Sequence, residues 1–266
     1  MLKSNNQTIG FVPTMGFLHE GHLALIKAAR EEADKVVLSI FVNPLQFGEN
    51  EDFDQYPRNE ENDLQLALDH GVDYVFIPGI DDMYPQPIGI SMAVTKRIGV
   101  LCDRSRPGHF SGVLTVLTKL FHFIQPDFAY FGMKDAQQIA IVDLLIKDLN
   151  FPIQLRMIPT VREDDGLAKS SRNVNLSKTE RKESTSLYQA LLRGKQLVID
   201  GERSTDKIEE EIVHFLNDHV SGKVDYVELL SFPKLEPISS DDSQVIIALA
   251  VQFKKARLID HVIFDI

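Results

Sequence analysis

The sequence predicts an α/β protein with a Rossmann-like parallel sheet and a second, smaller α+β domain. Over the first 160 residues, short runs rich in β-branched residues alternate with amphipathic helical stretches, which is typical of a parallel sheet covered on both faces. Near residue 175 this alternation ends, and two helical stretches followed by three strand-like runs take its place. We therefore expect a Rossmann-like domain over residues 1–175 and a small C-terminal α+β domain over residues 176–266.

The first three elements form a βαβ unit. Residues 8–12 (TIGFV) are a short apolar run, residues 22–33 place apolar side chains at helical spacing, and residues 35–42 (KVVLSIFV) are apolar and β-branched. Such a unit predicts parallel strands joined by a right-handed crossover. The same criteria predict further helices over residues 59–70, 112–124 and 136–149, and further strands over residues 73–78, 127–132 and 153–160.

The C-terminal part has a different order of elements. Consecutive strands with no helix between them favour antiparallel pairing, because parallel strands need a long crossover connection. The predicted helices cover residues 178–199 and 204–220, and the predicted strands cover residues 224–232, 244–253 and 257–266.

The composition is that of an ordinary globular protein, with 44% hydrophobic and 25% charged residues among 266. The formal charge of -11, from 28 basic and 39 acidic residues, disfavours a nucleic-acid partner, so an anionic substrate must be held by a local positive site. The single cysteine, Cys102, cannot form an internal disulfide. There is no apolar run of 18 residues and no cleavage-site pattern, so we expect a cytoplasmic protein with no membrane partner.

Residues 12–22 (VPTMGFLHEGH) follow the first strand, where sheets of this class bind ligands. A helix that begins here presents backbone N–H groups and the positive end of its dipole to a phosphate, and His19 and His22 add side-chain donors. Gly21 permits close approach by a bulky group. Two alternatives remain: an ordinary capped helix start, and a metal site, which a spacing of three rather than four residues disfavours.

A second motif, residues 131–138 (FGMKDAQQ), follows a later strand. Gly132 permits a close backbone approach and Lys134 supplies a cation, while Asp135 suits either helix capping or a hydroxyl ligand. Gln137 or Gln138 can face a polar ligand. The alternative is a solvated lysine beside an ordinary cap.

A third motif, residues 161–173 (VREDDGLAKSSRN), places two cations and two hydroxyls within four residues. We expect Gly166 to leave this loop flexible, so that it can close over a polyphosphate. Preorganised donors there would stabilise the charge that gathers on a departing pyrophosphate. The alternative is a polar linker between domains.

A fourth motif, residues 41–58 (FVNPLQFGENEDFDQYPR), begins at the end of the second strand. The amides of Asn43 and Gln46 suit a hydroxyl or amide ligand beside an apolar wall. In the companion segment of this motif, residues 106–113 (RPGHFSGV), Arg106 and His109 can meet a carboxylate or phosphate. The acidic residues 49–54 are interpreted as a solvated loop.

The HxGH and KSSR motifs resemble the paired signatures of the nucleotidyltransferase superfamily. Six blocks in order, PTMGFLHEGH, FVNPLQF, YPR, RPGHFSGV, FGMKDAQQ and REDDGLAKSSRN, together with the tail ARLIDHVIFDI, resemble the pantothenate synthetase (pantoate-β-alanine ligase) family. The resemblance implies ATP-dependent joining of pantoate and β-alanine through pantoyl adenylate. It also implies a homodimer, and Mg²⁺ that arrives on the phosphates of ATP rather than in a protein metal site.

The resemblance also assigns residues. It makes His22 the catalytic residue, Gln46 and Gln138 the pantoate ligands, and Gln46 a β-alanine ligand as well. Two departures are Lys169, where the family commonly has methionine, and a lead of nine residues before Gly10, which is short for the family. The implied ATP-binding residues are Met15, Gly16, Phe17, Leu18, His19, Glu20, Gly21, His22, Gly132, Met133, Lys134, Asp135, Val161, Lys169, Ser170, Ser171 and Arg172.

Two other functions remain open at this point. One is another adenylyl- or cytidylyltransferase that stops at nucleotide transfer, and the other is a non-catalytic nucleotide-binding module. A tRNA synthetase is disfavoured because the chain is short and acidic.

Overall fold

The computed structural model describes residues 6–48, 51 and 53–266. The chain divides into two compact units, of which the first comprises Met1–Thr95, Arg106–Met133 and Ile141–Thr160 and the second Lys96–Ser105, Lys134–Ala140 and Val161–Ile266. This division differs from a single boundary at residue 175, and the expected domains over residues 1–175 and 176–266 stay predictions. The expectation about the short N-terminal lead falls partly on residues 1–5, outside the described residues.

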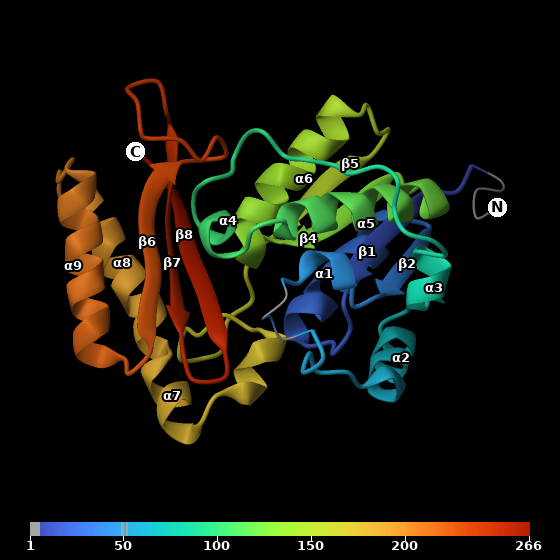
Figure 1. The fold of residues 1–266 in the computed structure, drawn as a ribbon, viewed down its shortest axis with the longest axis horizontal. Helices are drawn as coiled ribbons and strands as arrows, with labels where there is room; N and C mark the ends of the chain where they lie inside the picture. Colours follow the sequence, from blue (N-terminus) through green and yellow to red (C-terminus); the bar gives the residue numbers. More distant parts are fainter. Residues whose placement is uncertain (1–5, 49–50, 52) are drawn as a thin grey trace. The chain divides into compact units, whose positions relative to one another are not determined.

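The first unit contains five parallel strands in the order β3-β2-β1-β4-β5 (Figure 1). This confirms the Rossmann-like sheet. The strands follow one another outward from β1 on one side and from β4 on the other, so strand order reverses between β1 and β4, where such sheets bind ligands. The strands are β1 (Ile9–Thr14), β2 (Lys35–Ile40), β3 (Tyr74–Phe76), β4 (Phe128–Gly132) and β5 (Gln154–Ile158).

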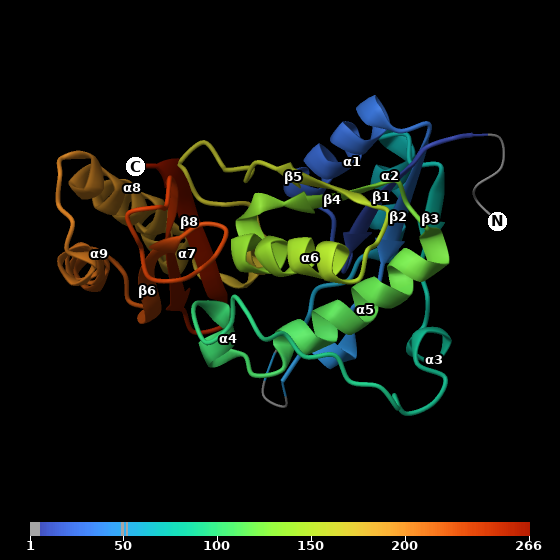
Figure 2. The same cartoon turned by 90° about the horizontal axis from the view of Figure 1, so that it is seen from above.

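Helices cover both faces of this sheet (Figure 2). Val12 of β1 belongs to the core shared with α1 (Glu20–Glu32) and α2 (Glu60–Asp69). The preceding residue, Phe11, points to the opposite face, where its ring meets Phe121 of α5 edge to face, with centroids 6.4 Å apart. Burial on both faces explains why the central strand β1 is mostly apolar in sequence. The other helices with residues in this unit are α3 (Ile80–Met83), α5 (His109–Ile124) and, from Ile141 onward, α6 (Ala136–Asp148).

The second unit is built on a three-stranded antiparallel sheet, β6-β7-β8, with α8 and α9 against one face (Figure 1). Alternate residues of β7 serve the two faces: Ile247 packs with the helices, whereas Ile246 packs with Leu101 and with Ala136 at the start of α6. The predicted α+β order is confirmed. The elements are α4 (Cys102–Ser105), α7 (Lys178–Glu183), α8 (Thr185–Ile199), α9 (Thr205–His219), β6 (Lys223–Ser231), β7 (Gln244–Gln252) and β8 (Arg257–Asp265).

One predicted helix is divided. Residues 178–199 form α7 and α8, with the break at Ser184, whose hydroxyl donates to the carbonyl oxygen of Arg181 at 2.8 Å. Serine side chains that bond to nearby backbone compete with the helical pattern. Among the described residues, no helix is long and apolar enough to span a bilayer.

Candidate active site

Three loops leave the five-stranded sheet at the carboxyl ends of neighbouring strands. β1 ends at Thr14 opposite Ile40 of β2, and the pairing of Gly10 with Phe128 brings Thr14 level with Gly132 at the end of β4. The predicted motifs after β1, β2 and β4 therefore emerge together, at the point where strand order reverses.

Both histidines after β1 cap helix α1. His19 is the N-cap residue, and its Nδ1 accepts a hydrogen bond from the backbone N–H of Gly21 at 3.1 Å. The Nδ1 of His22 accepts from the backbone N–H of His19 at 3.3 Å, and the two ring centroids lie 4.1 Å apart. Because Nδ1 is the acceptor in each neutral ring, the proton resides on Nε2, which makes Nε2 the donor. Helix capping and phosphate donation are therefore compatible roles for these histidines.

A buried carboxylate holds the loop between β1 and α1. Asp63 of α2 is 1% exposed, and its two oxygens accept hydrogen bonds from the backbone N–H groups of Phe17 and Leu18, each at 2.7 Å. The backbone of Gly16 (φ +83°) and Phe17 (φ +51°) is left-handed here, and a β-carbon on Gly16 would lie 2.9 Å from Asp63 Oδ2. Asp63 thus determines the path of the loop.

Sequence reasoning missed Asp63. The one signal in the sequence is spacing: Asp63 precedes Ala67 by four positions, so both lie on the buried face of the predicted helix. Gly21 also has a structural explanation, because a β-carbon there would lie 2.8 Å from Cε1 of His19. The space beside Gly21 is used by the imidazole ring.

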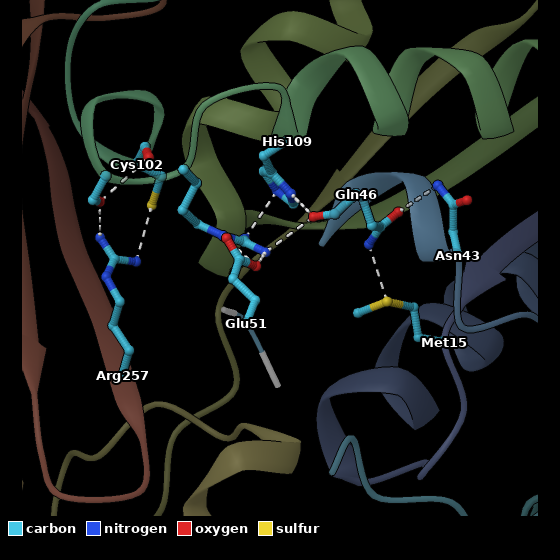
Figure 3. Close-up of polar contacts among 9 residues, drawn as sticks. Met15, Asn43, Gln46, Glu51, Cys102, His109 and Arg257 are labelled. Atoms are coloured by element: carbon cyan, nitrogen blue, oxygen red, sulfur yellow. Dashed lines mark hydrogen bonds and ion pairs between the residues drawn. The ribbon is translucent and has the colours of Figure 1, made fainter. Parts of the chain in front are cut away.

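Gln46 lies at the end of a 3-10 turn, η1 (Pro44–Gln46), that follows β2. Its Oε1 accepts from Nδ2 of Asn43 at 3.2 Å, and its Nε2 donates to Sδ of Met15 at 3.0 Å (Figure 3). The contact with Met15 links the loops after β1 and β2. Asn43, 1% exposed, also donates to the carbonyl oxygen of Gly112 and accepts from the hydroxyl of Tyr84, so its amide serves the fold.

Arg106 and His109 hold the main chain of Gln46. The Nδ1 of His109 lies 2.7 Å from the Gln46 carbonyl oxygen (Figure 3), to which Nη2 of Arg106 also donates at 3.3 Å. Arg106 additionally donates from Nε to Glu51 Oε1 at 3.0 Å. The carboxylate that Arg106 meets here is thus one of the protein's own, and Glu51 is not merely a solvated acid. Residues 49, 50 and 52 of the predicted acidic loop lie outside the described residues.

Gly132 ends β4 and is followed by Met133. A β-carbon on Gly132 would have one neighbour within 4 Å among the described residues, Cδ2 of Leu25 at 4.0 Å. Packing of the fold therefore does not require glycine at this position.

The other predicted residues belong to the second unit. Lys134 Nζ lies 3.9 Å from Asp135 Oδ2. Gln137 is buried and donates to the carbonyl oxygens of Arg97 and Val100, at 3.0 and 2.9 Å. Its side chain therefore joins α6 to the segment before α4, and the half-buried Gln138 is the better ligand candidate of the pair.

Residues 161–169 form a hydrogen-bonded hairpin, which differs from the expected flexible loop. The backbone N–H of Lys169 donates to the carbonyl oxygen of Val161 at 2.9 Å, and an antiparallel bridge pairs Arg162 with Ala168. Gly166 (φ +92°) lies in the turn, where its conformation is required.

The hairpin leads directly into the donor residues 169–172. Lys169 Nζ lies 3.7 Å from Glu163 Oε2, which offsets the additional charge. Ser170 is the N-cap of the turn η3 (Ser171–Asn175), with its hydroxyl accepting from the backbone N–H of Arg172 at 3.3 Å. Ser171 is buried.

A profile of the family described as pantoate-beta-alanine ligase matches residues 1–263. The chain belongs to this family. Pantothenate synthetase from Geobacillus sp. (strain WCH70) is 57% identical, over 98% of this chain and 92% of that protein. Pantothenate synthetase from Bacillus pumilus (strain SAFR-032) is 55% identical, over 99% and 91% respectively.

Solved structures of pantoate-β-alanine ligase family members have the same fold. Pantothenate synthetase from Thermus thermophilus is 43% identical with a TM-score of 0.91, and the match covers 96% of this chain and 92% of that one. The pantoate-beta-alanine ligase from Francisella tularensis, complexed with beta-gamma ATP and beta-alanine, is 35% identical with a TM-score of 0.82 and covers 98% and 91%. Membership of the pantoate-β-alanine ligase family favours the ligase over both alternative functions.

Proposed function

We propose that this protein joins pantoate to β-alanine, using ATP and releasing AMP and pyrophosphate, with the residues named above as its site. The family membership supports the reaction. The observation that carries the site is the set of donors at the carboxyl edge of the parallel sheet, above all His22, whose Nδ1 is engaged by the helix cap so that Nε2 donates.

The first step forms pantoyl adenylate. A carboxylate oxygen of pantoate attacks the α-phosphorus of ATP, and the bond from that phosphorus to the bridging oxygen breaks, so pyrophosphate leaves with the electron pair. Negative charge grows on the α-phosphoryl oxygens and on the pyrophosphate. Preorganised N–H donors and cations stabilise this charge without reorganising.

The second step forms the amide. The amine of β-alanine attacks the acyl carbon of the adenylate, the carbon–oxygen bond to AMP breaks, and the nitrogen loses a proton. A free carboxylate would have to expel oxide, whereas the mixed anhydride expels AMP. The site therefore needs phosphate donors more than a covalent nucleophile.

We assign the residues as follows. His22 is the catalytic donor to the reacting phosphate, Gln46 and Gln138 bind pantoate, and Gln46 also binds β-alanine. ATP is bound by Met15 to His22, Gly132 to Asp135, Val161 and Lys169 to Arg172. The unfilled space beside Gly132 supports a close approach of the nucleotide to the backbone there.

Mg²⁺ is proposed to arrive with the phosphates of ATP. Among the described residues, no group of three or more His, Cys, Asp or Glu side chains is placed to hold a metal ion. We further propose that the protein is cytoplasmic and acts as a homodimer. Sedimentation at working concentration tests the oligomeric state.

The experiment that tests this function is ATP–pyrophosphate exchange. We expect exchange only when pantoate is present, and net AMP and pantothenate only when β-alanine is added. Exchange that needs a phosphorylated acceptor instead of pantoate would point to a nucleotidyltransferase and overturn the ligase assignment.

Gly112 gives a test of the role of Gln46. A β-carbon on Gly112 of α5 would lie 2.1 Å from the carbonyl oxygen of Leu45 and 2.6 Å from the nitrogen of Gln46, both backbone atoms. Gly112→Ala should therefore displace η1, lower the free energy of unfolding by about 1–3 kcal/mol, and raise the KM for pantoate. Gly89→Ala, where a β-carbon meets nothing within 4 Å, is the matched control. An unchanged KM in Gly112→Ala would contradict the placement of Gln46 in the pantoate site.

A further inference from the structure

The hairpin that leads into Lys169–Arg172 is fixed to the antiparallel sheet by a buried ion pair. Nη1 and Nη2 of Arg162 donate to the two carboxylate oxygens of Asp260, at 2.7 and 2.9 Å. Asp260 lies in β8 and its side chain is 2% exposed, while that of Arg162 is 19% exposed. Two parallel hydrogen bonds of this kind determine orientation as well as distance.

The Arg162 guanidinium makes three further contacts. Its carbon lies 3.7 Å from the ring centroid of Tyr188, in α8. Nη1 also donates to the carbonyl oxygen of Gly166, in the turn of the hairpin, at 2.9 Å, and Nη2 donates to that of His261 at 3.3 Å. The guanidinium thus joins the turn, the sheet and a helix at one point.

The protonation state around this pair is settled by burial. Desolvation lowers the pKa of His261, the neighbour of Asp260, to about 4. His261 is therefore neutral near pH 7, and Arg162 is the cation that balances Asp260.

The ion pair is connected to the donor residues through the backbone. Arg162 pairs with Ala168 across the hairpin, and the next residue, Lys169, donates its N–H to the carbonyl oxygen of Val161. A displacement of Arg162 is therefore passed to Lys169 and to the turn that begins at Ser170.

We propose that Arg162 and Asp260 are positioning residues for the donors Lys169–Arg172, and that their pairing is required for adenylate formation but not for the attack of β-alanine on the adenylate. This rests on the proposed function. Pyrophosphate departs only in the first step, so donors aimed at it contribute to that step alone. A second anchor, Arg181 with Asp165 at 2.7 Å, keeps the hairpin folded when the first is lost, so the expected effect is misplacement of the donors.

The test separates the two half-reactions. Adenylate formation is measured as pantoate-dependent ATP–pyrophosphate exchange, and aminolysis as pantothenate formed from supplied pantoyl adenylate and β-alanine. Asp260→Asn keeps the size of the side chain and an acceptor for the backbone N–H of His261, but removes the charge. It should lower exchange by about 100-fold, the scale of losing one preorganised donor, and leave aminolysis close to the wild-type rate.

Arg162→Lys is the second variant. It keeps the charge but cannot reproduce the bidentate bonds or the stacking on Tyr188, so it should lower exchange to a smaller extent and also spare aminolysis. If Asp260→Asn does not fold, the comparison of the two half-reactions in Arg162→Lys tests the proposal.

The matched control is Asp242→Asn. Asp242 is also an ion-paired carboxylate in the second unit, with a side chain that is 5% exposed and 2.7 Å from Lys234, but it lies in the connection between β6 and β7. Its replacement should leave the ratio of the two half-reactions unchanged.

The outcomes are distinct. Equal losses in both half-reactions for Asp260→Asn and Arg162→Lys would reduce the pair to general structural support, and undiminished exchange in both would show that the donors do not depend on it. Either result overturns the proposal. Absence of pantoate-dependent exchange in the wild type would instead overturn the proposed function.

Discussion

Asp63→Ala is expected to abolish adenylate formation and to lower the free energy of unfolding by about 3 kcal/mol, because it leaves two backbone N–H groups without their acceptor. Leu18, one of the two donors, is 6% exposed, so water cannot fully replace the carboxylate. The left-handed conformation at Gly16 and Phe17 then loses the contact that holds it. Since this loop leads into His19 and His22, the donors move with it.

The measurements are chemical denaturation and pantoate-dependent exchange. Asp63→Asn retains one acceptor and should fall between the wild type and Asp63→Ala in both. Asp69→Ala, an exposed acid of the same helix that bonds to Gln65, should stay within about 0.5 kcal/mol of the wild type and remain active. An Asp63→Ala protein that retains full exchange activity would show that the loop does not depend on this carboxylate.

The architecture was predictable because buried positions are apolar, and their spacing differs between helices and strands. The runs at residues 8–12 and 35–42 are mostly apolar, and Phe11 and Val12 show why: consecutive side chains enter two different cores. The break at Ser184 was not predictable from periodicity, because residues 177–186 contain no apolar side chain whose spacing could mark a boundary. A local bond to Arg181, which any helical serine can form, marks the boundary.

The site was predictable as a set of motifs at strand ends, but the supporting contacts were not. Asp63 is 45 positions from Leu18, and nothing in the pattern of α2 identifies the partner of an acidic residue. Glu51 and Arg106 are similarly far apart in sequence, so the acidic loop and the basic turn could only be interpreted separately.

For two adjacent glutamines, the sequence did not show which side chain is available to a ligand. Gln137 and Gln138 lie in the first turn of one helix, and sequence spacing alone does not say which of them is taken up by the fold. The side-chain Nε2 of Gln137 donates to the carbonyl oxygens of Arg97 and Val100, which lie in a segment without regular secondary structure.

His22→Ala is expected to lower pantoate-dependent exchange by at least about 100- to 1,000-fold, the usual cost of removing one donor aimed at developing charge. The same substitution removes the acceptor that His22 provides to the backbone N–H of His19, so the helix start should lose about 1 kcal/mol of stability. An exposed histidine, His214, provides the control, and His214→Ala should change neither quantity.

The two roles of His22 are separated by His22→Glu. Glutamate at the third helical position keeps an acceptor for the N-cap backbone, as in a capping box, but has no N–H to donate. We therefore expect thermal stability near that of the wild type together with an exchange rate at least as low as that of His22→Ala. If His22→Glu restored exchange, capping alone would explain the histidine. A stable but inactive His22→Glu protein would assign the chemistry to Nε2, the nitrogen that remains a donor when Nδ1 accepts from the helix cap. It would also explain why the two histidines that cap this helix lie at the edge of the sheet where phosphate is expected.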